Sequence, residues 1–443
     1  MKIENSNIKN KQITFKSKED VLFKTLNATL KPLDSFIKMQ ENLSSTRFIQ
    51  DTATNWAPKA VFARSKADLA EMSFLEFLES GLFYFAPGIV GEKLLRRKVF
   101  AKSFDKDLIE NASKSVGNIL KDENLVKSGA AKKLIPLKAG ILLGCVCVPA
   151  AEYALSFAKN LFTLKVFKTT NFDKIANLDK NINQAEDKEK QEKVRKSAYK
   201  NIAKAGIIAA SGLGLGIFVA KTGHKSEAIQ KFSKILLEPG TAIAEKIEKS
   251  GKKAPRLSSF LKNYLNLDFD GEKGKLALSK GQLAVTAISG FFGYNHAAKD
   301  RSRLDQLEVL TRVPLVVFYT IFGSSLFESG FKSILHKNGI FSDLITKGSD
   351  NSLKVPLREE LPEIAKKLAT KNKTNIEDEF KKLIKGKATI TAVPFLFSLF
   401  FMGFTLSAVS RFWTQYRYNV QNNKTKTASN FIKETPEVFS KFS

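Results

Sequence analysis

Residues 388–410 read ATITAVPFLFSLFFMGFTLSAVS, a run of 23 residues without a charged side chain. Lys387 precedes this run and Arg411 follows it. A helix needs about 20 consecutive apolar residues to cross the hydrocarbon core of a bilayer. Helices of soluble proteins are rarely apolar on every face. The run therefore predicts a transmembrane helix, and it makes this chain a membrane protein by expectation.

An aromatic and basic cluster follows directly after the run. Its members are Trp413, Tyr416, Arg417 and Tyr418. Trp and Tyr concentrate where the bilayer meets water, and basic side chains bind headgroups at the same depth. We expect these four residues to be interface anchors of the last span.

Five further apolar runs lie earlier in the chain, at residues 72–90, 139–158, 205–220, 281–298 and 313–327. The second is a good candidate for a span. The third and fifth are short, although flanking basic side chains can extend to the interface. The first and fourth are either spans or interfacial or re-entrant helices. Alternating strand patterns are scarce, so we predict an all-α, multi-pass integral membrane protein with about six hydrophobic helices and two to six true spans.

The pattern predicts five parts along the chain. They are a polar basic N-terminal arm (1–72), a first hydrophobic helical half (73–222), a basic amphipathic connector (223–280), a second hydrophobic half (281–415) and a polar C-terminal tail (416–443). Short amphipathic helices are expected near Ser35 and Ala57 in the arm. The connector predicts either helices on a membrane surface or packing helices of a soluble subdomain.

Short sequence echoes suggest an internal duplication. Lys133-Leu-Ile-x-x-Lys138-Ala precedes the second run, and Lys382-Leu-Ile-x-x-Lys387-Ala precedes the sixth. A repeat would give two three-helix halves around a pseudo-axis, as in many transporters. Such short matches also arise by chance in a lysine-rich chain, so the duplication is a hypothesis.

The formal charge of +28 arises almost entirely from lysine, because only 12 of the 72 basic residues are arginine. Nucleic-acid readers favour arginine, whereas a lysine excess fits diffuse attraction to anionic surfaces such as phospholipid headgroups or nucleic acid. A compositional bias explains the excess equally well, because Lys, Asn, Phe and Ile are all abundant here, as expected from an AT-rich genome. We expect anionic lipid as a partner, leave a homo-oligomer or protein partner open, and disfavour nucleic acid. Four long loops carry 12, 12, 13 and 13 basic residues, so the positive-inside rule assigns no orientation.

Ionisable side chains in or beside the apolar runs are the candidate polar site. They are Glu76, Glu79, Glu152, Arg312 and Glu328. A charge at the centre of a span costs about 2.5–3.5 kcal/mol on insertion scales, so such residues often have a function. They either line a proton or cation pathway, or they mark segment ends and face other parts of the protein. The second interpretation is favoured.

Nothing in the sequence indicates catalysis, a metal site or a cofactor. Cys145 and Cys147 are expected to be small buried hydrophobes, and the glycine-rich stretch 211–216 is expected to mediate close helix packing. We expect a non-enzymatic membrane protein, structural or scaffold-like, with lysine-rich loops facing anionic lipid. The alternatives are a small transporter or channel that uses intramembrane carboxylates, and a soluble basic nucleic-acid-binding protein.

Overall fold

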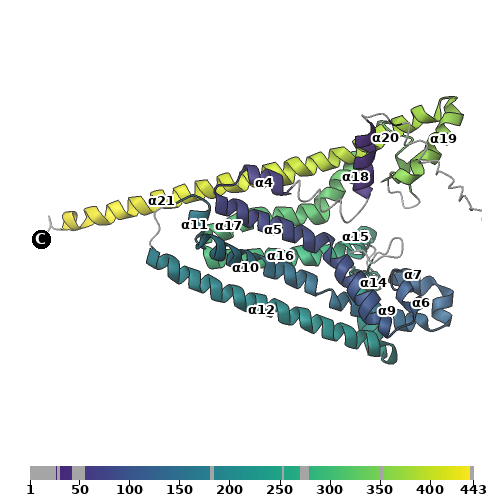
Figure 1. Ribbon diagram of the computed structural model, residues 1–443, viewed down its shortest axis with the longest axis horizontal. Helices are drawn as coiled ribbons and strands as arrows, with labels where there is room; N and C mark the ends of the chain where they lie inside the picture. Colours follow the sequence, from purple (N-terminus) through teal and green to yellow (C-terminus); the bar gives the residue numbers. More distant parts are fainter. Residues whose placement is uncertain are drawn as a thin grey trace, which may run out of the picture. The chain divides into compact units, whose positions relative to one another are not determined.

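The computed structural model describes residues 26, 30–41, 55–179, 184–251, 254–269, 279–348 and 353–439 (Figure 1). Across these ranges the chain is helical, and the strands there are limited to β1 (Thr346–Lys347) and β2 (Leu353–Lys354), which pair antiparallel. The predicted all-α fold is confirmed. The chain forms two compact units. The smaller unit contains residues 1–46 and 326–396, and the larger unit contains residues 47–325 and 397–443.

Four helices in the described ranges are long enough and apolar enough to cross a membrane. They are Ala130–Phe167, Lys188–Lys225, Arg303–Lys337 and Ile376–Asn423. These helices contain the second, third, fifth and sixth apolar runs. The helices with the first and fourth runs are not among them, so the expected number of about six spans is not confirmed.

The larger unit is a bundle of long helices with shorter helices between them. Before its longest helix it contains α4 (Ala57–Val61), α5 (Lys66–Tyr84), η2 (Pro87–Val99), η3 (Phe100–Lys102), α6 (Lys106–Asn111), α7 (Val116–Lys121), α8 (Glu123–Lys127), α9 (Ala130–Gly144), α10 (Cys147–Phe167) and α11 (Phe172–Ile175). From there it contains α12 (Gln184–Thr222), η4 (Gly223–Lys225), α13 (Glu227–Leu237), α14 (Pro239–Lys249), α15 (Pro255–Leu265), α16 (Lys280–Arg301), α17 (Arg303–Phe318), η6 (Tyr319–Gly323), η8 (Leu399–Thr405) and α21 (Leu406–Phe439).

Serine side chains cap the starts of five of these helices, α5, α7, α13, α16 and α17. Ser65, Ser279 and Ser302 accept hydrogen bonds from backbone amides three residues later, at the starts of α5, α16 and α17. Each bond satisfies an amide that has no partner within its helix. The two caps at Ser65 and Ser302 fix the helix starts from which the charged residues of the site project.

Long helices that follow one another in the sequence run in opposite directions. Tyr153 contacts Asn201 while Gly140 contacts Gly216, so α12 runs back along α9 and α10. In the same way α5 runs opposite to α10 and α16, and α17 runs opposite to α21. Figure 1 shows α12 alongside α10 over much of its length.

Glycines bring α9 and α12 into backbone contact. A β-carbon added to Gly140 would lie 2.4 Å from the carbonyl oxygen of Gly216, and one added to Gly212 would lie 2.7 Å from that of Leu143. Only glycine allows so close an approach. The prediction that the glycine-rich stretch mediates helix packing is confirmed.

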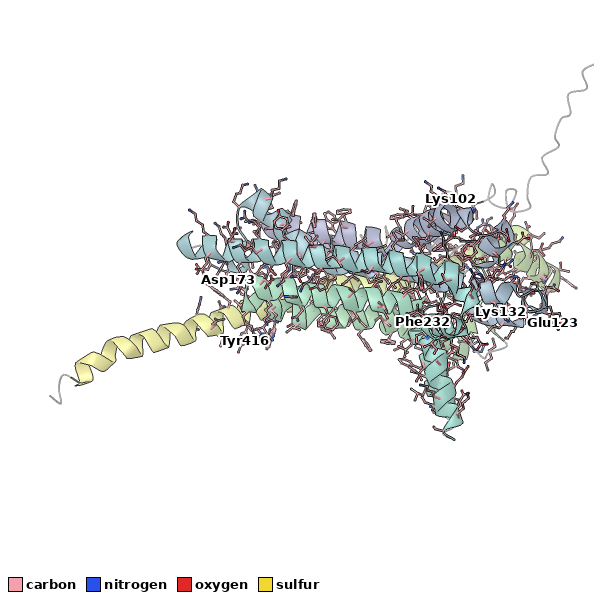
Figure 2. All side chains as sticks on the ribbon, turned by 90° about the horizontal axis from the view of Figure 1, so that it is seen from below. Lys102, Glu123, Lys132, Asp173, Phe232 and Tyr416 are labelled. Atoms are coloured by element: carbon pink, nitrogen blue, oxygen red, sulfur yellow. The ribbon has the colours of Figure 1, made fainter. Side chains whose placement is uncertain are left out.

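The larger unit has two distinct ends, which Figure 2 shows with Lys102, Glu123, Lys132 and Phe232 at one end and Asp173 and Tyr416 at the other. The first end holds the main hydrophobic core, in which Phe100, Ile119 and Leu134 pack with Leu237 and Phe269. The second end is polar and holds the candidate site.

The smaller unit packs around a buried ion pair. Its elements are α2 (Leu30–Glu41), most of α18 (Ser324–Lys337), the two strands, η7 (Arg358–Glu360), α19 (Leu361–Asn372) and α20 (Ile376–Ser398) up to residue 396. The Nε of Arg358 lies 2.7 Å from an oxygen of Asp34, and its guanidinium stacks over Phe380. Both charges are almost completely buried, so the pair ties the N-terminal helix α2 to the later helices.

The expected helices of the N-terminal arm are present as α2 and α4, while residues 1–25, 27–29 and 42–54 lie outside the described part. The amphipathic connector forms α13, α14 and α15. Residues 252–253 and 270–278 of the connector also lie outside the described residues. Nothing in the structure tests the internal duplication, which stays a prediction.

Candidate functional site

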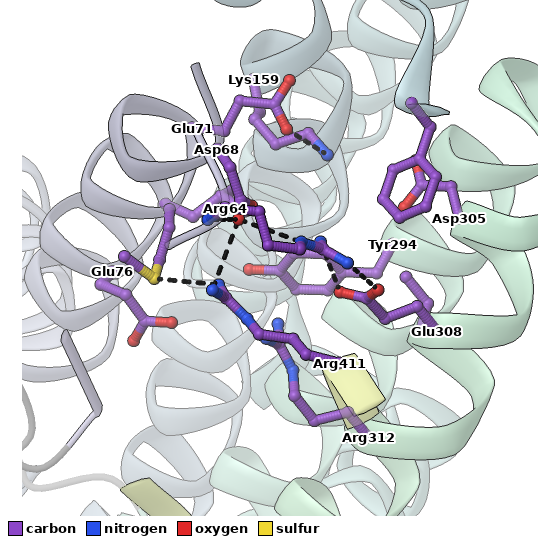
Figure 3. Close-up of a pocket in the computed structure, with 14 residues that line it drawn as sticks. Arg64, Asp68, Glu71, Glu76, Lys159, Tyr294, Asp305, Glu308, Arg312 and Arg411 are labelled. Atoms are coloured by element: carbon purple, nitrogen blue, oxygen red, sulfur yellow. Dashed lines mark hydrogen bonds and ion pairs between the residues drawn. The ribbon is translucent and has the colours of Figure 1, made fainter. Parts of the chain in front are cut away.

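A small polar cavity lies at the second end of the larger unit, between α5, α10, α16, α17 and α21 (Figure 3). Its volume is about 70 Å³, enough for a few water molecules or a small ion. The residues that line it are Arg64, Asp68, Glu71, Met72, Leu75, Glu76, Lys159, Phe172, Tyr294, Asp305, Glu308, Val309, Arg312 and Arg411.

Arg64 links three parts of the chain at this cavity. Its two terminal nitrogens donate to both oxygens of Glu308, at 2.8 and 3.1 Å, and its Nε lies 3.2 Å from Asp68. Asp68 also lies 3.4 Å from the Nη1 of Arg411. A two-point arginine–carboxylate pair fixes both distance and orientation, so this group holds the starts of α5 and α17 together.

A second cluster forms around Arg301, which ends α16. Its Nη1 donates to Glu71 at 3.0 Å, and its Nε lies 3.3 Å from Asp305. Lys159 lies 3.7 Å from the same oxygen of Glu71. The guanidinium groups of Arg64 and Arg301 both lie over the ring of Phe172, with 5.3 and 5.9 Å from the guanidinium carbon to the ring centroid. Phe172 therefore joins the two clusters through cation–π contacts.

The paired charges shift the pKa values of the carboxylates that precede the first apolar run. Burial by itself would raise the pKa of Asp68, but Arg64 and Arg411 lower it below its usual value. Burial likewise opposes ionisation of Glu71, and Arg301 and Lys159 outweigh it, so its pKa is also lowered. For Arg64, Glu308 and Asp68 outweigh the effect of burial and raise the pKa. These groups are held in their charged forms.

Most of these residues were not predicted as site residues, although the sequence contains a signal for them. Glu71 immediately precedes the first apolar run and Lys159 immediately follows the second, while Arg411 immediately follows the sixth. Arg301 and Asp305 lie between the fourth and fifth runs. These flanking charges come from different runs, and they gather at one end of the bundle.

Three of the four predicted intramembrane carboxylates, Glu76, Glu79 and Glu152, lie close to one another near this cavity. Glu76 pairs with Lys59 of α4. Glu79 accepts a hydrogen bond from the hydroxyl of Tyr294 at 2.8 Å. Glu152 is buried to 1% exposure, and the two other glutamates are the charges that act on it.

The other predicted residues are placed differently. Arg312 lines the cavity. Glu328 belongs to the smaller unit, where it is half exposed and pairs with Lys332.

The predicted interface anchors lie on α21. The rings of Trp413 and Tyr416 stack with 5.5 Å between their centroids, and Arg417 lies over Trp413. Trp413 and Tyr416 are exposed, whereas Tyr418 packs against the buried cluster around Phe172. Their role at a lipid interface stays a prediction.

The side chains that line the cavity offer charge and hydrogen bonding. Over the described ranges, no group of three or more His, Cys, Asp or Glu side chains is placed to hold a metal ion. Comparison with known proteins adds nothing, because no family model, curated protein or solved structure matches this chain.

Proposed function

We propose that this chain is a non-enzymatic, multi-pass membrane protein of a structural or scaffold type. Its apolar helix faces contact lipid tails, and its lysine-rich helices contact anionic headgroups. The exposed apolar surface of the long helices is the observation that carries this proposal.

Three of the four candidate spans have bare apolar faces. Only 22%, 12% and 22% of the most apolar window is buried in Lys188–Lys225, Arg303–Lys337 and Ile376–Asn423. On α12, Ile207 is 67% exposed and Phe218 is 55% exposed. Contiguous apolar surfaces of this kind are rare on soluble monomers and mark contact with a membrane or a partner. They also disfavour the soluble nucleic-acid-binding alternative.

The alternating helix directions support crossing by all six runs. The starts of the first and fifth runs and the ends of the second, fourth and sixth are joined by the ion pairs at one end of the larger unit. A chain that crosses a bilayer six times brings these same ends to one side. The helices α5 and α16 lie alongside α10, so we propose that they cross together with it.

The connector supports contact with anionic lipid. α13 packs on α9 through Leu237, while Phe232 and Ile235 on its other side are exposed. Lys231 and Lys234 flank these two residues and are exposed as well. A helix with exposed apolar and basic side chains together binds the interfacial region of an anionic bilayer.

Fractionation of the expressed full chain tests membrane insertion. We expect the protein to stay in the membrane pellet after washing with high salt and with alkaline carbonate, because buried apolar helices are not released by either treatment. Release by carbonate would overturn the proposal.

Lipid retention tests the proposed headgroup contact. The chain is reconstituted in mixed anionic and zwitterionic vesicles and then purified in mild detergent. We expect anionic lipid to be enriched in the wild type and less enriched after Lys231→Glu with Lys234→Glu. The matched control carries Lys196→Glu with Lys200→Glu, the same charge change on exposed positions of α12. Equal retention in both variants would contradict a role for α13.

A small transporter or channel is the second candidate function. One observation favours it, which is the nearly complete burial of Glu152 within a candidate span.

A further inference from the structure

The side chain of Glu152 lies in a confined space between three helices, α10, α16 and α5. It projects from α10, and Gly290 of α16 leaves room for it, since a β-carbon there would lie 2.9 Å from the Oε1 of Glu152 and 3.0 Å from its Cγ. α5 packs against α10 and brings Glu76 and Glu79 near the carboxyl group of Glu152. The carboxyl group is thus enclosed rather than directed to solvent.

The carboxyl group of Glu152 is also incompletely bonded. Its Oε2 is buried and has no hydrogen-bond partner among the described residues. A buried carboxylate normally receives a cation or several hydrogen bonds, because the loss of solvation is otherwise uncompensated. A protonated carboxyl carries no charge and does not need a neighbouring cation.

The groups around Glu152 add negative rather than positive charge. On α5, Glu79 accepts from Tyr294 of α16, and Glu76 is already paired with Lys59 of α4. Where α10 faces α12, Tyr153 makes the polar contact, and its hydroxyl donates a hydrogen bond to the side-chain oxygen of Asn201.

Two further polar side chains of α16, His296 and Asp300, act on Tyr153. His296 lies 3.2 Å from the hydroxyl of Tyr153, and the charge of Asp300 acts on the same phenol. Asp300 itself accepts a hydrogen bond from Ser197 of α12. Among the described residues, none of these groups donates to the Oε2 of Glu152.

We propose that Glu152 is a proton-binding site at membrane depth. It holds an exchangeable proton, and Tyr294, which donates a hydrogen bond to Glu79, also lines the ion-pair cavity. The ligand is a proton rather than a metal ion, because the described carboxylates do not form a metal-holding group. This inference rests on the membrane insertion proposed above.

The test uses the full chain in native membranes and dicyclohexylcarbodiimide, an apolar reagent that modifies protonated carboxyl groups inside bilayers. Peptide mass spectrometry locates the adduct. We expect an adduct on Glu152 at neutral and acidic pH that is lost as the pH rises. Glu308, which is paired with two nitrogens of Arg64, is the internal control and should stay unmodified.

Two variants sharpen the result. Glu152→Gln should lose the adduct, together with the infrared carboxyl stretch that titrates with pH in the wild type. Gly290→Ala keeps the carboxyl group of Glu152 but places a methyl group in the space that it occupies. We therefore expect a smaller yield of the adduct on Glu152. If Glu152→Gln does not accumulate, the wild-type labelling decides by itself.

Carbonate washing of the same membranes separates the two proposals. A chain that stays in the pellet without an adduct on Glu152 at any pH overturns the proton site alone. A chain that carbonate releases overturns both membrane insertion and the proton site.

Discussion

At the scale of single residues, buried arginines hold the larger unit together by pairing with carboxylates from other helices. Arg64 and Arg301 each contact two acidic side chains. Arg301 is buried with both of its partners, while the side chains of Arg64 and Glu308 keep 15% and 11% of their surface exposed. Removing one member of a buried pair leaves the other charge uncompensated, which is far more costly than losing an exposed pair.

Glu308→Gln should therefore destabilise the protein strongly. It removes the charge that pairs with both terminal nitrogens of Arg64, and the loss should be about 3 kcal/mol or more. The thermal unfolding midpoint of the detergent-solubilised chain measures it. Glu328→Gln is the matched control, because its pair with Lys332 is 50% exposed at the carboxylate and should contribute about 0.3–0.5 kcal/mol. Equal effects would show that the Arg64 pair is not buried in the folded protein.

Acid should destabilise the protein through Asp68 and Glu71. The pKa values of both are lower in the folded state than their usual values of 3.8 and 4.5. The folded state thus binds these protons more weakly than the unfolded state does. Their contribution is fully present above the usual values and is lost as the pH falls through the lower folded values.

The unfolding midpoint should accordingly be steady above about pH 5 and fall at more acidic pH. Asp68→Asn should lower the midpoint at neutral pH and make the acid-induced fall shallower. Glu328→Gln keeps both carboxylates and should follow the wild-type curve. A steeper fall in Asp68→Asn would contradict the assigned shift.

At the scale of helices, a glycine crossing sets how closely α9 and α12 approach. The contact at Gly140 and Gly216 is between backbone atoms, so neither side can move without moving its helix. α12 itself is one helix of 39 residues, which joins a highly charged first half to the third apolar run. The charged half is helical from residue 184 onward. The apolar half is therefore continuous with a rigid helix rather than attached through a loop.

Gly216→Ala should push the two helices apart and destabilise the protein by about 1–3 kcal/mol, the usual effect of overpacking. Gly214→Ala lies on the same helix with nothing within 4 Å of the added carbon. It should instead stabilise the helix by up to about 1 kcal/mol, because alanine is the better helix former. Chemical unfolding in detergent distinguishes the two, and stabilisation by both would place the crossing elsewhere.

At the scale of the whole molecule, the larger unit has an apolar middle between two ends that carry charge. Figure 2 shows Lys102 and Lys132 at one end and Asp173 and Tyr416 at the other. If all six runs cross the bilayer, these ends face opposite sides of the membrane. Four crossings by the second, third, fifth and sixth runs alone would put Lys159 and Arg301 on opposite sides, yet both contact Glu71.

Single-cysteine labelling tests this arrangement after Cys145 and Cys147 are replaced by alanine. With a membrane-impermeant maleimide on sealed vesicles, Lys102→Cys and Lys132→Cys should react from the same side. Lys174→Cys and Tyr416→Cys should react only from the other side. All four positions are exposed, which removes burial as an explanation. Labelling of Lys102 and Lys174 from one side would contradict six crossings.

The sequence by itself determined the all-helical fold and the apolar character of the long helices. Both follow from local properties, namely the length of uncharged runs such as 388–410 and the scarcity of alternating patterns. It also predicted the glycine packing at 211–216, because small residues in an apolar helix have few other uses.

Only the tertiary structure decided which charges meet. Arg64 and Glu308 are 244 positions apart, and Glu71 and Arg301 are 230 apart, so no spacing rule relates them. Glu328 resembled Glu79 in its local sequence, yet one lies half exposed in the smaller unit and the other binds Tyr294. Pairing of buried charges depends on helix direction and register, which are set by packing of whole helices rather than by neighbours in the chain.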